Sequence, residues 1–138
     1  MSDHFLLRLE NLLFLIAAVV SALMLIWPMI RRGPKEVDTR VAIQLINHED
    51  ALVLDVRDDS DYAAGHLPNS THIPTEKIED RWIEIQKHKD RPILVIYSSG
   101  IRSHHASKVL SKNGFAKVHN LMGGIDAWRR ASLPIVKR

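Results

Sequence analysis

The first hydrophobic pattern along the chain is an uncharged run from Leu12 to Ile30, which only Ser21 and Pro28 interrupt. At about 1.5 Å per residue, a helix of this length matches the hydrocarbon core of a bilayer. A secretory signal peptide would have a shorter apolar stretch, a more basic start and small residues at its end. A buried core helix would show a polar stripe, which this run lacks. The pattern therefore predicts a transmembrane helix over residues 12–30, preceded by a short extracytoplasmic N-terminus, residues 1–11.

The charges flanking this run indicate its orientation. Arg8 precedes it, whereas four basic residues follow it, namely Arg31, Arg32, Lys35 and Arg40. Lys and Arg are retained on the cytoplasmic side of a membrane. We therefore expect a single-pass protein of the cell inner membrane with its N-terminus outside and its C-terminal domain in the cytoplasm. A basic linker over residues 31–38 is expected to hold that domain beside the lipid bilayer, because eight extended residues reach at most about 29 Å.

From residue 39 to residue 138, helical and strand patterns alternate. Val41, Leu45 and Ile46 share one face of a predicted helix that Asp38 or Thr39 can cap. Further helices are expected around residues 78–85, over 103–112 and from residue 125. Strands are expected within the apolar runs 51–56, 92–97 and 117–121. Nearly continuous apolar runs are typical of parallel strands that helices cover on both faces. The pattern predicts an α/β sandwich with a central parallel sheet and functional loops at the carboxyl ends of its strands.

The amino-acid composition excludes several classes of function. A chain of 138 residues has room for one domain beyond the predicted span. The absence of cysteine excludes disulfides, thiolate metal sites and cysteine nucleophiles. The net charge of +3 comes from bases interspersed with acids, and aromatic residues make up only 6%, so we expect no nucleic-acid partner. No pair of histidines has metal-ligand spacing with a third ligand, and we expect neither a metal nor a cofactor.

Several spaced motifs between about residues 37 and 136 resemble the rhodanese-like family. Its first signature is matched by Asp55-Val56-Arg57, Tyr62, Gly65 to Ser70 and His72-Ile73-Pro74. Its C-terminal signature is matched by Gly114-Phe115, Val118, Leu121 to Gly124 and Trp128. With the predicted span, the chain resembles the membrane-anchored, single-domain rhodanese-like proteins of bacteria. The resemblance implies a rhodanese-like sandwich, in which we expect Asp55 and Arg57 to support loops through hydrogen bonds.

The family's active loop follows the central strand and contains a cysteine, then four residues, then a basic residue. The matching segment here is Tyr97-Ser98-Ser99-Gly100-Ile101-Arg102, which places Tyr97 at the cysteine position. A phenol has a pKa near 10 and does not carry a sulfane sulfur. The resemblance therefore implies a site without a catalytic residue.

Two other uses of this loop stay open on the sequence alone. Ser98 could act as a nucleophile if His104 or His105 served as its base. The loop from Tyr97 to Arg102 could instead hold an anion through its backbone N–H groups and the charge of Arg102. Against both, Tyr97 could fill the pocket and the loop could merely cap the following helix.

These observations predict a rhodanese-like domain without sulfurtransferase activity, tethered at the cytoplasmic membrane face. We expect it to act as a module that binds a membrane or membrane-associated protein, or an anion. The alternative is a thiosulfate sulfurtransferase-type enzyme that works with a thiol of its partner. Fold alone does not decide between them, because fold and chemistry separate easily.

Overall fold

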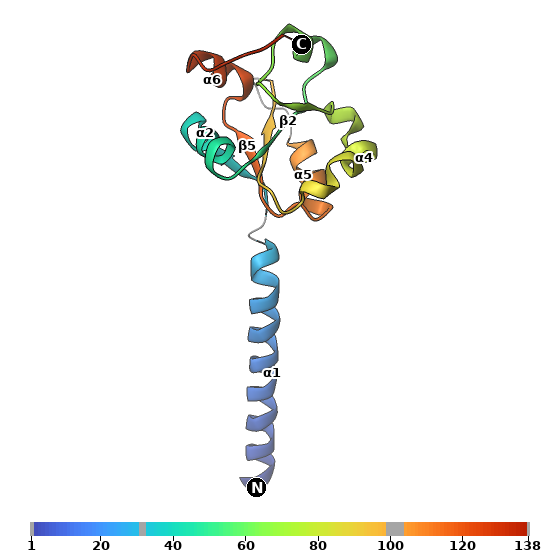
Figure 1. Ribbon diagram of the computed structural model, residues 1–138. Helices are drawn as coiled ribbons and strands as arrows, with labels where there is room; N and C mark the ends of the chain where they lie inside the picture. Colours follow the sequence, from blue (N-terminus) through green and yellow to red (C-terminus); the bar gives the residue numbers. More distant parts are fainter. Residues whose placement is uncertain (1, 31–32, 99–103, 138) are drawn as a thin grey trace. The chain divides into compact units, whose positions relative to one another are not determined.

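The computed structural model describes residues 2–30, 33–98 and 104–137 of the chain. It divides into two units, Met1–Arg32 and Gly33–Arg138. The first unit is one helix, α1, Ser2–Ile30 (Figure 1). The second holds a parallel sheet with helices on both faces. The predicted α/β class is thus confirmed.

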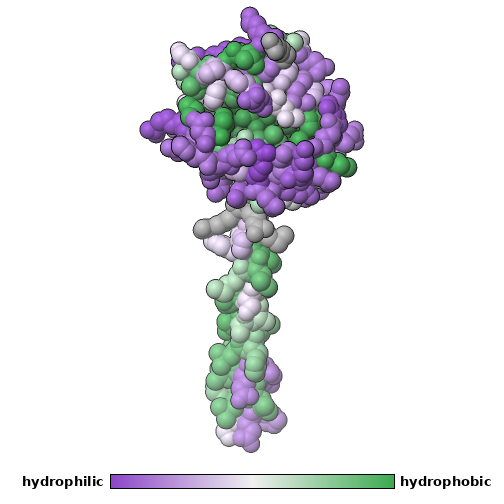
Figure 2. Space-filling view, viewed as in Figure 1, coloured by the Kyte–Doolittle hydropathy of each residue, from purple (hydrophilic) through white to green (hydrophobic). Residues whose placement is uncertain are grey.

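Helix α1 is longer than the span predicted from its apolar run. Residues 2–11, predicted as a separate N-terminal segment, continue the same helix, because the leucines of this stretch favour helical backbone although polar residues separate them. The part from Ser2 to Pro28 is long and apolar enough to cross a membrane, with a mean hydropathy of 2.4 in its most apolar window. A signal sequence near an N-terminus meets the same criteria. Figure 2 shows the helix hydrophobic along most of its length and, on the visible face of the second unit, a hydrophobic area surrounded by hydrophilic residues.

The sheet has five parallel strands in the order β1-β5-β4-β2-β3. Their bounds are Lys35–Val37 for β1, Leu52–Asp55 for β2, Thr71–His72 for β3, Ile93–Ile96 for β4 and Val118–Leu121 for β5. Strand β1 lies within residues 31–38, which the sequence predicted to be a linker. That prediction was wrong for Lys35 to Val37, because pairing with β5, which is distant in the sequence, makes this short segment an edge strand.

Two cores lie on the two faces of the sheet. On one face, α2 (Thr39–His48) and α6 (Gly124–Arg130) cover sheet side chains such as Leu94 and Ile96, and α6 contributes Trp128 to this core. On the other face, α4 (Ile78–Arg81) and α5 (His105–Lys112) cover Ile93, Val95 and Phe115 (Figure 1). The remaining helical segments are α3 (Asp59–Ala64), η1 (Thr75–Lys77) and η2 (Trp82–His88). The helix predicted around residues 78–85 is therefore one turn of α-helix followed by 3₁₀-helix, and α5 begins two residues later than predicted.

The cap of α2 gives a first testable prediction. Asp38 accepts a hydrogen bond of 2.9 Å from the backbone N–H of Val41, which has no partner within the helix. We expect Asp38→Ala to lower the free energy of unfolding by about 1 kcal/mol, and Asp38→Asn to keep most of the stability. Urea unfolding followed by circular dichroism measures both. Equal losses in the two variants would show that the carboxylate acts in some way other than capping.

Candidate functional site

The side chain that the sequence resemblance assigns to the cysteine position points into the core. Tyr97 follows β4 on the same face as Ile93 and Val95, and 9% of it is exposed. Its hydroxyl accepts a hydrogen bond of 3.2 Å from the backbone N–H of Ser107 and lies 3.1 Å from the Ser107 hydroxyl. That hydroxyl in turn donates to the side-chain oxygen of Asn120. The phenol therefore belongs to a buried polar chain that joins β4, α5 and β5.

This contact has a clear role in the local structure. Ser107 is the third residue of α5, so its N–H is one of the helix donors that lack an intrahelical acceptor. The phenol oxygen supplies that acceptor from inside the core. In this chain the residue after β4 thus caps the following helix.

The histidines beside Tyr97 are engaged with carboxylates. His104 packs edge-on against the Tyr97 ring, with centroids 5.3 Å apart, and its Nε2 lies 2.7 Å from an oxygen of Glu36 in β1. His105 faces Glu79 at 3.5 Å. Ser98 is exposed, and within the described segments neither imidazole has a hydrogen bond to it. The Ser98–histidine pair considered from the sequence therefore has no geometric support.

The remaining residues predicted to form an anion loop are Ser99, Gly100, Ile101 and Arg102, which lie outside the described residues. Just before them, the backbone of Tyr97 and Ser98 lies against the start of α6. The N–H of Ile125 donates a 3.0 Å hydrogen bond to the Tyr97 carbonyl, and Gly124 has a φ of +57°. A Cβ at Gly124 would overlap that carbonyl oxygen, so only glycine allows this close approach.

Burial raises the pKa of the Tyr97 phenol, against the smaller effect of its hydrogen bonds with Ser107. In the unfolded chain the phenol has its ordinary pKa of about 10. Above about pH 10, the unfolded state therefore loses this proton before the folded state does, and stability falls as the pH rises.

We expect the unfolding free energy to decline between about pH 9 and about pH 11, and the Tyr97→Phe variant to show a shallower decline. Urea unfolding at each pH measures this slope. The same slope in both proteins would mean that Tyr97 does not titrate differently on unfolding.

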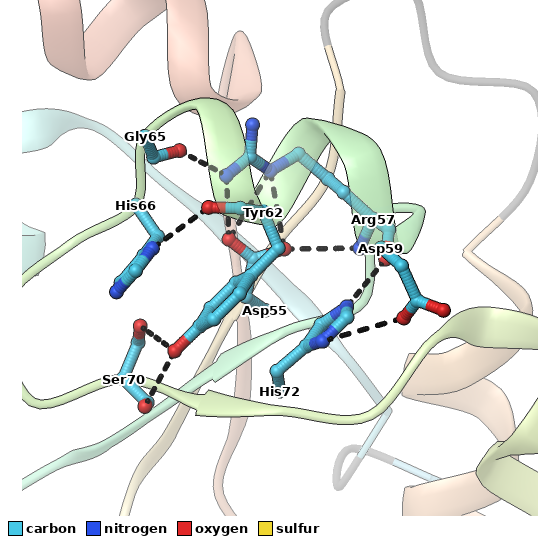
Figure 3. Close-up of polar contacts among 8 residues, drawn as sticks. All are labelled: Asp55, Arg57, Asp59, Tyr62, Gly65, His66, Ser70 and His72. Atoms are coloured by element: carbon cyan, nitrogen blue, oxygen red, sulfur yellow. Dashed lines mark hydrogen bonds and ion pairs between the residues drawn. The ribbon is translucent and has the colours of Figure 1, made fainter. Parts of the chain in front are cut away.

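Asp55 and Arg57 form a buried ion pair at the carboxyl end of β2 (Figure 3). The guanidinium donates through Nε and Nη2 to both carboxylate oxygens, at 2.8 to 3.1 Å, and the Arg57 backbone N–H donates to the same carboxylate. Nη2 also donates to the carbonyl of Gly65 at 2.6 Å. The side chains of Arg57 and Asp55 are 3% and 0% exposed. Both charges are thus used to hold the segment after α3 against the end of β2.

Sequence reasoning missed a stack of three rings beside this pair. Tyr62 lies between His66 and His72, with ring centroids 3.8 and 4.2 Å from its own and nearly parallel planes (Figure 3). His66 Nδ1 donates to the Tyr62 carbonyl at 2.7 Å, and His72 Nε2 donates to the Arg57 carbonyl at 2.8 Å. The Tyr62 hydroxyl donates to the Ser70 carbonyl. The four-residue spacing of Tyr62 and His66 was the available signal, and it was weak because His66 lies two residues beyond the end of α3 at Ala64.

Comparisons with known proteins agree with this architecture. The rhodanese-like domain family matches residues 38–131. The uncharacterized protein YibN of Escherichia coli is 34% identical over 88% of this chain and 86% of its own length. A sulfurtransferase of Allochromatium vinosum is 39% identical over 73% of this chain and 94% of its own. The thiosulfate sulfurtransferase GlpE of Pseudoalteromonas translucida is 32% identical, over 75% and 97%.

Among solved structures, a rhodanese-related protein from Thermoplasma volcanium superposes with a TM-score of 0.63 at 29% identity, and covers 75% of this chain and 99% of that one. The family match, the curated relatives and the parallel sheet with its two helical layers lead to one conclusion. The chain belongs to the rhodanese-like family.

Proposed function

We propose that this protein is a membrane-tethered rhodanese-like domain that does not transfer sulfur and that binds another protein at the cytoplasmic face of the inner membrane. The observation that carries the proposal is the state of Tyr97. It stands where the family has its cysteine, and its hydroxyl is committed to the N–H of Ser107 inside the core. A neutral, buried phenol has neither the charge nor the sulfur chemistry that a persulfide intermediate needs.

The tether is supported by α1 and by one of the comparisons. Residues 1–32 make up nearly a quarter of the chain, so a match that covers 88% of it extends into the helix. The two sulfurtransferases cover 73% and 75%, which the second unit alone can accommodate. The similarity to YibN thus includes part of the apolar helix together with the domain.

The orientation is open to a direct test. Because the basic residues follow the span, we expect a C-terminal tag to resist protease in intact spheroplasts and to be cleaved after lysis. A periplasmic reporter domain of known topology is the control for spheroplast integrity. Cleavage of the tag in intact spheroplasts would place the domain outside the cytoplasm and contradict the proposal.

Binding to a protein is tested by photo-crosslinking in native membranes. Met122 follows β5 at the carboxyl edge of the sheet and is 52% exposed, whereas Ile83, on η2, is 56% exposed. A photoreactive residue at Met122 should give a reproducible adduct of defined mass, and one at Ile83 should not. Adducts of the same pattern from both positions, or none from Met122, would contradict a specific partner at this edge.

The rival function is sulfur transfer in which a partner supplies the thiol. The relatives named as sulfurtransferases favour it. The two functions differ in one outcome: a partner captured at Met122 should restore turnover of thiosulfate only if the rival is right. Absence of turnover with the partner present supports the binding module.

A further inference from the structure

The parallel sheet has two chemically different edges. All five strands run in the same direction, so the turns that lead into β1, β2, β4 and β5 meet at one edge, which we call the amino edge. Six basic residues lie on these turns, at a strand start or in the last turn of the preceding helix, namely Lys35, Lys87, Lys89, Arg91, Lys112 and Lys117. The acids of the same turns are Glu49, Asp50 and Asp90. The amino edge therefore carries a net positive charge.

Contacts between these turns show that the charges share one surface. Lys117 accepts the backbone hydrogen bond of Ile93 at 2.8 Å, which joins the turns before β5 and β4. Arg91 reaches across to Asp50 at 3.3 Å and to its backbone carbonyl, which adds the turn before β2. Lys89 lies over the rings of Trp82 and Phe115. Arg91 and Lys89 thus already contact other groups of the domain. The exposed basic residues are Lys35, Lys87, Lys112 and Lys117.

The pKa values of two histidines at the amino edge are shifted in the direction that nearby cations produce. The pKa of His119 is lowered by burial and further by Lys35 and Lys117, against the opposing effect of Glu49. The pKa of His88 is lowered by burial and further by Arg91 and Lys87, against that of Asp50. At both positions the cations contribute to keeping the imidazole neutral.

Chain connectivity joins this edge to α1. The helix ends at Ile30 and β1 begins at Lys35, so the start of β1 stays within about 18 Å of the helix end, whatever path the chain takes between them. The carboxyl edge is different, because the segments after β1 and β2, through the first turn of α3, carry Asp38, Asp58, Asp59 and Asp61 against Arg57, which is paired with Asp55. Strand β1 thus begins at the basic edge, which is the edge from which the chain leads back to α1.

We propose that the amino edge is an electrostatic contact surface for an anionic lipid bilayer, an inference that rests on the membrane tether of the proposed function. Basic residues within a Debye length of an anionic leaflet each strengthen association about fivefold. Contact at this edge leaves the carboxyl edge, with the exposed Met122 and Ser98, available to a protein partner. The tether and the basic edge together set the orientation of the domain.

The experiment uses the full chain in vesicles, and the absence of native cysteine makes single labels simple. Ala116→Cys places a fluorophore on the amino edge, and Ser60→Cys places one after β2 at the carboxyl edge; both positions are exposed. An impermeant dye labels only the domains that face outward. A quencher on the lipid headgroups then reports how close each label lies to the bilayer, in phosphatidylcholine alone or mixed with phosphatidylglycerol.

We expect the Ala116 label to be quenched more strongly in phosphatidylglycerol vesicles than in phosphatidylcholine vesicles, and the Ser60 label to show no such difference. Replacing Lys87, Lys112 and Lys117 together by Gln should lower the ratio of docked to free domains about a hundredfold. Replacing Arg40, Lys77 and Arg130 by Gln removes the same charge elsewhere and should leave the ratio unchanged. High salt should also lower the ratio of docked to free domains, as the substitution of the three lysines does, because about 1 M salt shortens the Debye length to about 3 Å.

Equal quenching of the Ala116 label in the two kinds of vesicle, or equal effects of the two sets of substitutions, would overturn the contact surface while leaving the tether intact. Alkaline carbonate extraction tests separately whether the membrane tether itself is wrong. A chain that carbonate removes from the vesicles has no membrane-spanning helix, which overturns the tether and the surface with it.

Discussion

Replacing Tyr97 by Ala is expected to lower the free energy of unfolding by about 3–5 kcal/mol, the usual cost of truncating a large buried aromatic residue. The ring packs against β4 and α5, and its loss leaves a cavity beneath the start of α5. Tyr97→Phe keeps the ring but leaves the Ser107 N–H without its acceptor, at a cost of about 1–3 kcal/mol. Urea unfolding of the full chain in detergent, followed by far-ultraviolet circular dichroism, measures both losses.

Tyr62 offers a matched control. Its hydroxyl also makes a hydrogen bond, which it donates to the Ser70 carbonyl, but the residue is half-buried, and water can replace the lost contact. Tyr62→Phe should therefore cost less than Tyr97→Phe. If Tyr97→Phe were as stable as the native chain, the phenol would not cap α5, and the structural role assigned to this position would be wrong.

The second large effect is expected from Arg57→Met, at about 3–5 kcal/mol of unfolding free energy. The substitution leaves the fully buried carboxylate of Asp55 without its counterion and removes the bond to the Gly65 carbonyl. Most of the cost comes from the uncompensated charge, so the double variant Asp55→Leu with Arg57→Met should recover a large part of the lost stability. Urea unfolding of the two variants in parallel measures the recovery.

An exposed ion pair controls for loss of charge as such. Arg81 and Glu84 pair at 2.6 Å on the surface, and Arg81→Met should change stability far less than Arg57→Met. If the double variant were less stable than Arg57→Met alone, the cost of Arg57→Met would come from lost hydrogen bonds rather than from an unpaired charge, and the buried-charge explanation would fail.

Much of the fold could be predicted because the apolar runs are long enough to have one interpretation. The run within residues 92–97 gave a central strand, and β4 contributes to both cores. The element boundaries that were predicted wrongly depend on contacts between residues that are distant in the sequence. Nothing local marks Lys35 to Val37 as a strand, since it is the pairing with β5 that defines it.

The candidate site was predictable in its chemistry but not in its geometry. The position of Tyr97 in the loop followed from the spacing of Gly100 and Arg102. Its hydrogen bond to Ser107 did not, because a contact across ten residues depends on how α5 packs on β4. For the same reason the stack of Tyr62 with His72 could not be predicted: it forms only when β3 pairs with β2 and brings His72 beside α3.

The central claim is that this rhodanese-like domain does not itself transfer sulfur. Its most direct test is to incubate the purified full chain with thiosulfate, follow thiocyanate formation from cyanide, and weigh the intact protein by mass spectrometry. A cysteine-containing thiosulfate sulfurtransferase of the family is the positive control, and the chain after heat denaturation is the blank. The account predicts no turnover above the blank and no protein mass increased by a sulfur atom. Steady turnover, or a chain that gains one sulfur, would contradict it.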